Sequence, residues 1–166
     1  MEPLAFAYYR AVAPMMWVLV ALMAVEMLVV HGLLAFWFPV TALVLTAGTL
    51  LFIGWLARAI GSMRRLPVLV DDQRVLMRVG LIRALSVPLD AIDHVGGELA
   101  QAELGRDVLN LALIAHPNIH LRLKQPLKLK RRTLLAVAHR LDNPGAFTAA
   151  VEQRLRVEDA PARAAA

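Results

Sequence analysis

Two ionisable residues stand inside the most apolar part of the chain. Between residues 11 and 57 the only side chains able to carry a charge are Glu26 and His31. A charged group at the centre of a membrane-spanning helix costs about 2.5–3.5 kcal/mol on translocon scales, so such residues usually face protein or a polar path. Five positions of an ideal helix amount to about 140° of rotation, which separates the two residues. We expect Glu26 to make a contact within the membrane segment or between copies, with a proton or ion relay as the alternative.

A run of basic residues late in the chain is the second candidate site. Six cations fall within eleven residues that contain no acid. Such a cluster attracts anionic lipid headgroups by about 1 kcal/mol for each cation near the membrane surface, or binds an acidic partner, although solvated surface explains it equally well. Nucleic acid is disfavoured because no aromatic side chains are interleaved for base stacking. The six residues are Arg122, Lys124, Lys128, Lys130, Arg131 and Arg132.

Histidine, serine and cysteine provide no pattern that indicates catalysis. His116 and His120 have a spacing that suits two metal ligands on a helix, but Pro117 between them indicates a turn, so we expect solvated side chains. The only serines, Ser62 and Ser86, lie outside any Gly-x-Ser-x-Gly motif. The chain has no cysteine, which excludes thiolate ligands and cysteine nucleophiles. We predict no metal site and no catalytic residue.

The glycines and the acidic residues of the same region are equally uninformative about chemistry. Gly96-Gly97 belongs to neither a Gly-x-Gly-x-x-Gly run nor a Gly-Lys-Ser/Thr ending, so nucleotide binding has no support. Glu98, Glu103 and Asp107 fall near Arg106 in an expected surface connection. No nucleophile or metal ligand accompanies them. We therefore expect a non-enzymatic protein without a cofactor.

The composition divides the chain into two solvent regimes. It is 59% hydrophobic with a mean hydropathy of +0.60, which is too apolar for an ordinary soluble domain. Residues 58–166 nevertheless hold 17 of the 18 basic residues and 11 of the 13 acidic ones. The apolar excess therefore lies in the first third of the chain, and a basic, water-soluble part follows it.

Residues 1–66 are predicted to form a transmembrane hairpin. Each of two spans, near 12–32 and 39–57, has about the 20 apolar residues that a bilayer requires, and Pro39 suits the first turn of a helix. A cleaved signal peptide is the less favoured explanation of the first span. The connecting turn lacks Lys and Arg, so the positive-inside rule places both termini in the cytoplasm. The flanking cations are Arg10, Arg58, Arg64 and Arg65.

Residues 67–157 are predicted to form a domain of short antiparallel strands closed by one helix. Apolar alternation and turn residues indicate strands near 68–70, 75–79, 81–87, 89–95, 108–115, 119–124 and 133–140. A capping residue and a proline in Asp142-Asn143-Pro144 begin the helix. One face of it carries Phe147, Ala150, Val151 and Leu155. Residues 158–166 are predicted to be a disordered tail.

Three phrases of the sequence resemble a family of bacterial membrane proteins with two spans and a cytoplasmic pleckstrin-homology-like (PH-like) domain. They are PVLVDDQRVLMRVG at 67–80, VPLDAI at 87–92 and DNPGAF at 142–147, and Glu26 and His31 match a Glu and a His in the first span of that family. The resemblance implies an α+β membrane protein in which an antiparallel β-barrel is closed by the C-terminal amphipathic helix. The cations between Arg122 and Arg132 depart from the family pattern.

These patterns together favour a binding or scaffolding function at the inner membrane of a bacterium. The PH-like domain would bind protein partners, a second copy of itself, or anionic lipid headgroups. The alternative is a small transporter or an accessory subunit of a larger membrane complex, in which Glu26 and His31 line a polar path. Two spans are too few to enclose a path, so that alternative requires a homo-oligomer or a larger partner.

Overall fold

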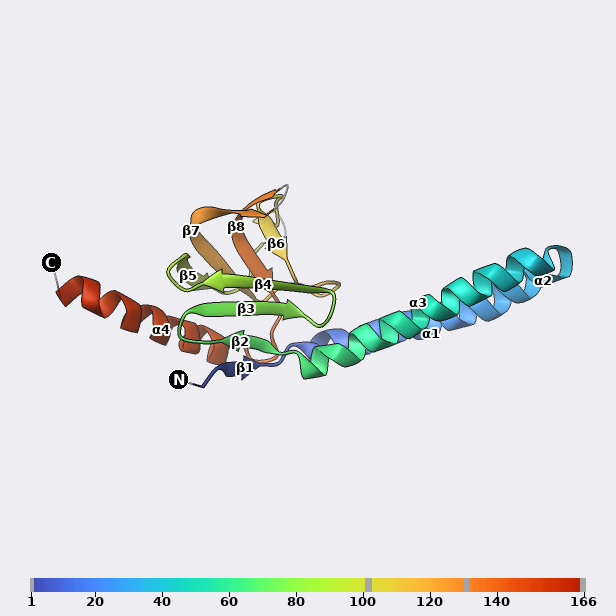
Figure 1. The fold of residues 1–166 in the computed structure, drawn as a ribbon, viewed down its shortest axis with the longest axis horizontal. Helices are drawn as coiled ribbons and strands as arrows, with labels where there is room; N and C mark the ends of the chain where they lie inside the picture. Colours follow the sequence, from blue (N-terminus) through green and yellow to red (C-terminus); the bar gives the residue numbers. More distant parts are fainter. Residues whose placement is uncertain (1, 101–102, 130–131, 165–166) are drawn as a thin grey trace.

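The chain folds into a long helical pair and a β-rich domain that is followed by a helix (Figure 1). A computed structural model describes residues 2–100, 103–129 and 132–164, without the side chains of residues 11, 132 and 158–164. The elements in order are β1 (Leu4–Phe6), α1 (Tyr9–Glu26), the π-helix η1 (Met27–His31), α2 (Gly32–Trp37), α3 (Pro39–Arg65), β2 (Val68–Val70), β3 (Arg74–Val79), β4 (Arg83–Pro88), β5 (Ile92–Gly96), β6 (Val108–Asn110), β7 (Ile119–Leu129), β8 (Arg132–His139) and α4 (Pro144–Ala164).

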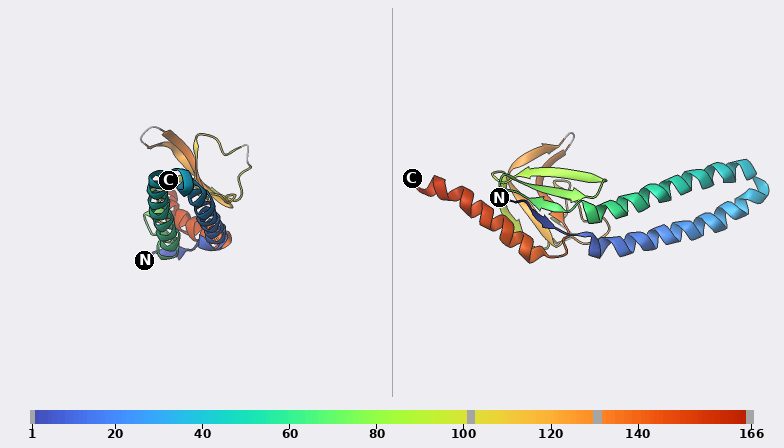
Figure 2. Two further views of the ribbon diagram at one scale, coloured as in Figure 1. Left: turned by 90° about the vertical axis from the view of Figure 1, so that its right-hand side faces the viewer. Right: turned by 60° about the horizontal axis from the view of Figure 1, so that its bottom comes forward.

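The helical pair consists of two antiparallel rods joined by a tight turn at Phe38. The first rod is continuous through α1, η1 and α2, and the second is α3, which begins at Pro39 as the sequence predicts. Val12–Trp37 and Pro39–Arg65 are 26 and 27 residues long and apolar enough to cross a membrane. Figures 1 and 2 show the helical pair extending away from the β-rich domain, and most of its side chains are exposed. An exposed apolar surface of this extent marks a contact with a membrane or with another protein.

The strands form two four-stranded sheets. One has the order β1-β2-β3-β4 and is antiparallel throughout, whereas the other has the order β5-β7-β8-β6 and includes a parallel pair, β6 with β8. The closed antiparallel barrel expected from the sequence is therefore wrong for the described residues, although β2, β3 and β4 pair consecutively and antiparallel as the sequence predicts. The chain turns at 88–92 through the bonds Ala91 N–H to Pro88 O and Ile92 N–H to Leu89 O. After this turn β5 pairs with β7, and the two sheets stay separate.

A single hydrophobic core joins the two sheets to α4. Asn143 caps the helix by accepting a hydrogen bond from Ala146 N–H at 3.2 Å, as the capping sequence predicts. Phe147 and Val151 are fully buried, and Leu155 is half-buried. Other core residues come from both sheets, including Met77, Ile92, Leu121 and Val137. The helix continues to Ala164, and the disorder predicted for 158–166 stays a prediction.

A short strand lies near the N-terminus, where the sequence predicts none. Residues 4–6 precede the helical pair, yet they pair antiparallel with β2, which follows it, in the register Leu4↔Val70 and Phe6↔Val68. The Phe6 ring also meets the Phe147 ring edge-on, with centroids 5.3 Å apart. The N-terminal segment therefore belongs to the β-rich domain, and the two ends of the helical pair lie side by side (Figure 1).

Candidate functional site

The helical pair and the β-rich domain meet at Tyr8, between β1 and α1. Its side chain is 1% exposed. The hydroxyl accepts a hydrogen bond from Gly80 N–H at 2.6 Å and donates one to Leu66 O at 3.0 Å. Burial raises the pKa of Tyr8 above its usual range, so the hydroxyl keeps its proton and its donor function. One side chain thus bonds the residue after α3 to the β3–β4 turn.

The β3–β4 turn packs directly on the last turns of α3. Gly80 has φ of +49°, and a Cβ there would overlap the Ser62 hydroxyl and come within 3.1 Å of Ala59 O. Only glycine combines this backbone conformation with so close an approach. Ser62 Oγ donates to Ala59 O at 2.6 Å and accepts from Leu81 N–H at 3.0 Å. Ser62 is therefore a structural residue of the junction.

His139, at the end of β8, completes the junction from the second sheet. Its ring packs on Tyr8 with centroids 5.0 Å apart and is 1% exposed. Nδ1 accepts from Arg140 N–H at 2.7 Å, and Nε2 lies 2.8 Å from Arg78 O. An amide can only donate and a carbonyl can only accept, so the contacts select the neutral Nε2–H tautomer. Burial lowers the pKa of His139 accordingly.

Asp142 adds a further link between the domain and the start of α1. Its backbone N–H donates to Ala7 O at 2.9 Å, and its carboxylate accepts from Arg10 N–H at 3.3 Å. The first turn of a helix has backbone N–H groups without intrahelical partners. A carboxylate there also interacts favourably with the helix dipole. Asp142 therefore stabilises the beginning of α1 from across the domain interface.

The π-helix η1 begins directly after Glu26 and ends at His31. Because a π-turn bonds residue i to i+5, the ideal-helix separation of Glu26 and His31 does not apply. His31 Nδ1 lies 3.1 Å from Thr46 Oγ1, whose proton is donated to Ala42 O at 2.7 Å. His31 therefore donates to Thr46 and connects the two rods. Glu26 is exposed, and it has no hydrogen bond or ion pair within the described part of the chain.

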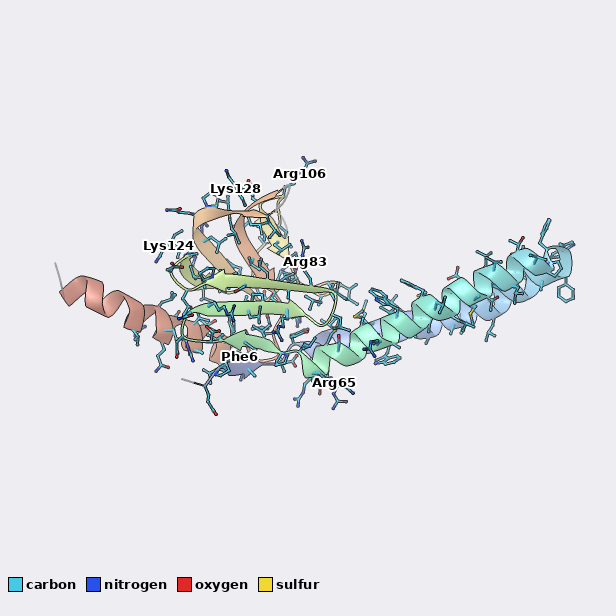
Figure 3. All side chains as sticks on the ribbon, in the orientation of Figure 1. Phe6, Arg65, Arg83, Arg106, Lys124 and Lys128 are labelled. Carbon is cyan, nitrogen blue, oxygen red and sulfur yellow. The ribbon has the colours of Figure 1, made fainter. Side chains whose placement is uncertain are left out.

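The described residues of the basic cluster lie on the β7–β8 ribbon. Arg122 and Lys124 point outward from β7, where buried Ile119, Leu121 and Leu123 alternate with them, and Lys128 is exposed further along. Lys130 and Arg131 lie outside the described residues, and only the backbone of Arg132 is described. Figure 3 shows Lys124 at the end of the domain opposite the helical pair, whereas Arg65 and Arg83 lie at the near end.

The two histidines considered as metal ligands each contact a backbone carbonyl. His116 Nε2 and His120 Nδ1 lie within hydrogen-bond distance of Leu99 O and Gly97 O, respectively. Among described residues no group of three or more His, Cys, Asp or Glu could hold a metal ion.

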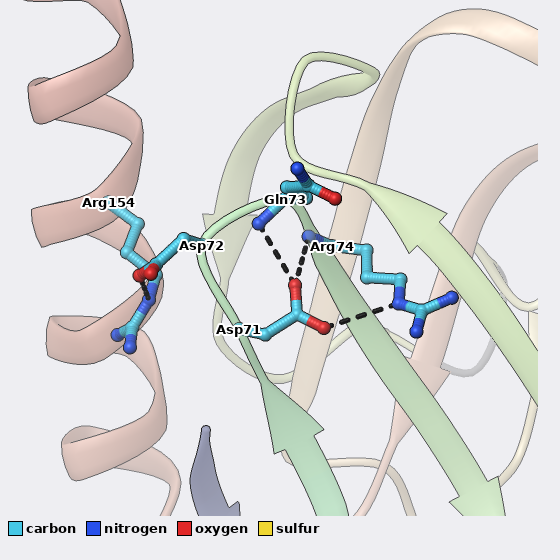
Figure 4. A network of polar contacts seen from close by, with 5 residues as sticks. All are labelled: Asp71, Asp72, Gln73, Arg74 and Arg154. Carbon is cyan, nitrogen blue, oxygen red and sulfur yellow. Dashed lines mark hydrogen bonds and ion pairs between the residues drawn. The ribbon is translucent and has the colours of Figure 1, made fainter. Parts of the chain in front are cut away.

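The β2–β3 turn is held by a polar network (Figure 4). Asp71 accepts bonds from the Gln73 and Arg74 amides at 2.9 and 2.8 Å and from Arg74 Nε at 3.2 Å. Burial opposes ionisation of Asp71, but these donors lower its pKa overall. Arg154 Nε lies 3.5 Å from an Asp72 carboxylate oxygen, which connects α4 to the same turn. The network explains the Asp71-Asp72 pair as a structural feature.

Comparison with known proteins adds no relative: no family model matches the chain, and searches of curated proteins and of solved structures give no significant match.

Replacing Tyr8 with Phe should weaken the junction without removing the ring. The change leaves Gly80 N–H and Leu66 O without their partner, and an unsatisfied buried polar group costs about 1–3 kcal/mol. We expect a lower thermal unfolding midpoint in detergent and faster hydrogen exchange of the Gly80 amide. Tyr9→Phe is the matched control, because the Tyr9 hydroxyl has no hydrogen bond among the described residues. Equal behaviour of the two variants would contradict the role given to Tyr8.

Acid should destabilise the protein through His139. Its folded-state pKa lies below the ordinary value of 6.5, so the unfolded chain binds a proton first as the pH falls below about 6.5. Stability is then lost with a slope of up to about 1.4 kcal/mol per pH unit, until the folded-state pKa is reached. Denaturant unfolding across this window measures the slope. His139→Gln should remove the pH dependence of unfolding that His139 contributes, while His94→Gln, at an exposed position, should keep it. An unchanged slope in His139→Gln would refute the role given to His139.

Proposed function

We propose that this chain is a two-span integral membrane protein whose folded domain is held in one orientation at the inner face of a bacterial membrane. The observation that carries the proposal is the pairing of β1, which precedes the helical pair, with β2, which follows it. This pairing requires both ends of the pair to lie on one side of any membrane that it crosses. The cations Arg10, Arg58, Arg64 and Arg65 at these ends favour the cytoplasmic side.

We also propose that the domain is PH-like. Seven strands in two sheets follow the helical pair, and a C-terminal helix packs its apolar face against them. This element order agrees with the family that the sequence resembles. The separate sheets are the point on which the resemblance is weakest.

The proposed activity is binding or scaffolding by a non-enzymatic protein. Tyr8, Ser62 and His139 join the domain to the end of the helical pair. The same surfaces of the domain would therefore always face the membrane and the cytoplasm. Protein partners or a second copy are the proposed ligands. Exposed Glu26 is a proposed contact between copies, because a lipid-facing carboxyl group is costly. Arg122, Lys124 and Lys128 remain a proposed site for an acidic partner or anionic lipid. Their place on the β7–β8 ribbon favours the acidic partner, because Lys124 lies far from the helical pair (Figure 3).

A subunit of a larger transport complex is the second candidate. A groove of about 360 Å³ runs beside His31 and Thr46 and is otherwise lined by apolar residues and glycine. In this alternative a partner covers the groove, and Glu26 and His31 form part of a polar path.

The topology can be tested with reporter fusions. A reporter that is active only in the cytoplasm should be active when fused after Ala166, and one that is active only in the periplasm should be inactive there. Inserting each reporter at the Phe38 turn should give the reverse pattern. Periplasmic activity after Ala166 would contradict the proposed orientation.

The role of Glu26 can be tested by two substitutions. Glu26→Gln should keep most of the assembly because the amide preserves hydrogen bonding, whereas Glu26→Leu should loosen the oligomer or complex seen by native mass spectrometry in mild detergent. Val29→Leu, at another exposed position of the span, is the control. If all three variants assemble normally and a proton-coupled activity disappears in both Glu26 variants, the transport alternative replaces the contact.

A further inference from the structure

The exposed apolar residues of the β-rich domain are concentrated in two loops. Six large hydrophobic side chains after Arg65 are exposed among those described, and four of them occur as two adjacent pairs. Leu81 and Ile82, in the β3–β4 turn, are 60% and 41% exposed. Leu113 and Ile114, between β6 and β7, are 40% and 47% exposed. Paired apolar residues at loop tips differ from the scattered single ones that are normal on a soluble surface.

The first pair is fixed beside the end of α3. Leu81 N–H donates to Ser62 Oγ at 3.0 Å, and the neighbouring Gly80 N–H donates to Tyr8. Figure 1 shows β3 directed toward the helical pair, with the β3–β4 turn at that end of the domain. The position of Leu81 and Ile82 relative to the helical pair is therefore determined by hydrogen bonds.

The second pair extends from the same end of the other sheet. Since β6 is parallel to β8, the chain leaves β6 toward the end of β8 where His139 packs on Tyr8. The loop is fixed there by Leu111 N–H to Ala138 O and by Asn118 N–H to His139 O. Leu113 has φ of +55°, a conformation that favours glycine. The loop thus places a leucine at a position where glycine would be less strained, as expected when the side chain has a function.

The level of the two loops can be compared with the thickness of a bilayer. The helix from Pro39 to Ala59 has a length of about 30 Å at 1.5 Å per residue, which equals the thickness of the hydrocarbon core. Gly80 approaches Ala59 and Ser62, so the β3–β4 turn lies about one core thickness from the far end of α3. When Pro39 lies at one boundary of the hydrocarbon core, that level is the opposite boundary between acyl chains and headgroups.

Cations surround the loops at this level. Arg83 follows Ile82 and is exposed, and Arg64 and Arg65 are exposed at the end of α3. Near the second loop, Arg140 Nη1 donates to His116 O at 3.0 Å. Arginine beside exposed leucine and isoleucine is the combination that matches a headgroup layer above acyl chains.

We propose that Leu81-Ile82 and Leu113-Ile114 insert into the interfacial layer of the bilayer leaflet that the helical pair crosses. The occupant of this apolar surface is lipid, because both loops lie at the end of the domain that faces the spans and arginines lie beside them. The inference rests on the proposed membrane function and adds a second attachment of the domain. The two loops, together with the spans, restrict tilting of the domain relative to the membrane plane.

Because the chain has no cysteine, a label can be attached at single introduced cysteines. Single cysteines replace Leu81, Ile82, Leu113 or Ile114 in the full chain, carry a nitroxide label, and are studied in phosphatidylethanolamine–phosphatidylglycerol liposomes. Collision rates with lipid-soluble oxygen and with a water-soluble nickel complex report the environment of each label. All four positions should favour oxygen over the nickel complex. Gln125→Cys, exposed on β7, is the aqueous control, and Leu51→Cys, exposed on α3, is the lipid control.

The two control labels distinguish failure of loop insertion from failure of the proposed membrane function. If Leu51→Cys favours oxygen while the four loop positions resemble Gln125→Cys, the spans are in lipid and loop insertion is wrong. If the loop labels are shielded from both reagents, a protein covers the surface, which also overturns lipid contact. If Leu51→Cys itself is aqueous, the membrane function fails, and loop insertion fails with it.

Discussion

The antiparallel pairing of β1 with β2 is the constraint on which the remaining architecture depends. It makes residues 4–6 and 68–70 neighbours in one sheet, so the helical pair between them must return to its starting point. Tyr8 then bonds that sheet to the residue after α3 and to the β3–β4 turn, and His139 connects the second sheet to the same tyrosine. Because these groups are buried, each lost bond would leave a polar group unsatisfied, which favours one relative orientation of the helical pair and the domain.

A fixed orientation gives the two ends of the β-rich domain different environments. The end near α3 carries Leu81, Ile82, Leu113 and Ile114 with neighbouring arginines, and the opposite end carries Lys124 (Figure 3). Apolar and cationic side chains together suit the boundary of a bilayer, whereas a lysine far from the spans suits water or an acidic protein. The division of roles that we propose, with lipid contact at one end and partner binding at the other, follows from this asymmetry.

Local patterns in the sequence predicted local structure well. The apolar runs and Pro39 indicated the two long helices, and Asn143-Pro144 indicated the start of α4. Contacts between distant residues were not accessible in this way. Three residues before the first span carry no strand signal of their own, and β1 forms only because β2 provides an edge. Gly80 looked like an ordinary turn glycine, and Ser62 was considered only as a nucleophile. The π-helix could not be predicted either, because Met27–His31 has a composition typical of a regular apolar helix.

The central claim, that the helical pair and the β-rich domain move as one body, is tested most directly by a distance measurement between them. Spin labels are attached at Leu51→Cys on α3 and Gln125→Cys on β7 in the otherwise cysteine-free chain. Pulsed electron–electron double resonance in lipid nanodiscs then gives the distribution of distances between the two labels. The account predicts a single, narrow distance distribution that stays the same in detergent and in nanodiscs. A broad or multimodal distribution, with the fold of the domain intact, would show that the domain is flexibly tethered and would contradict the account.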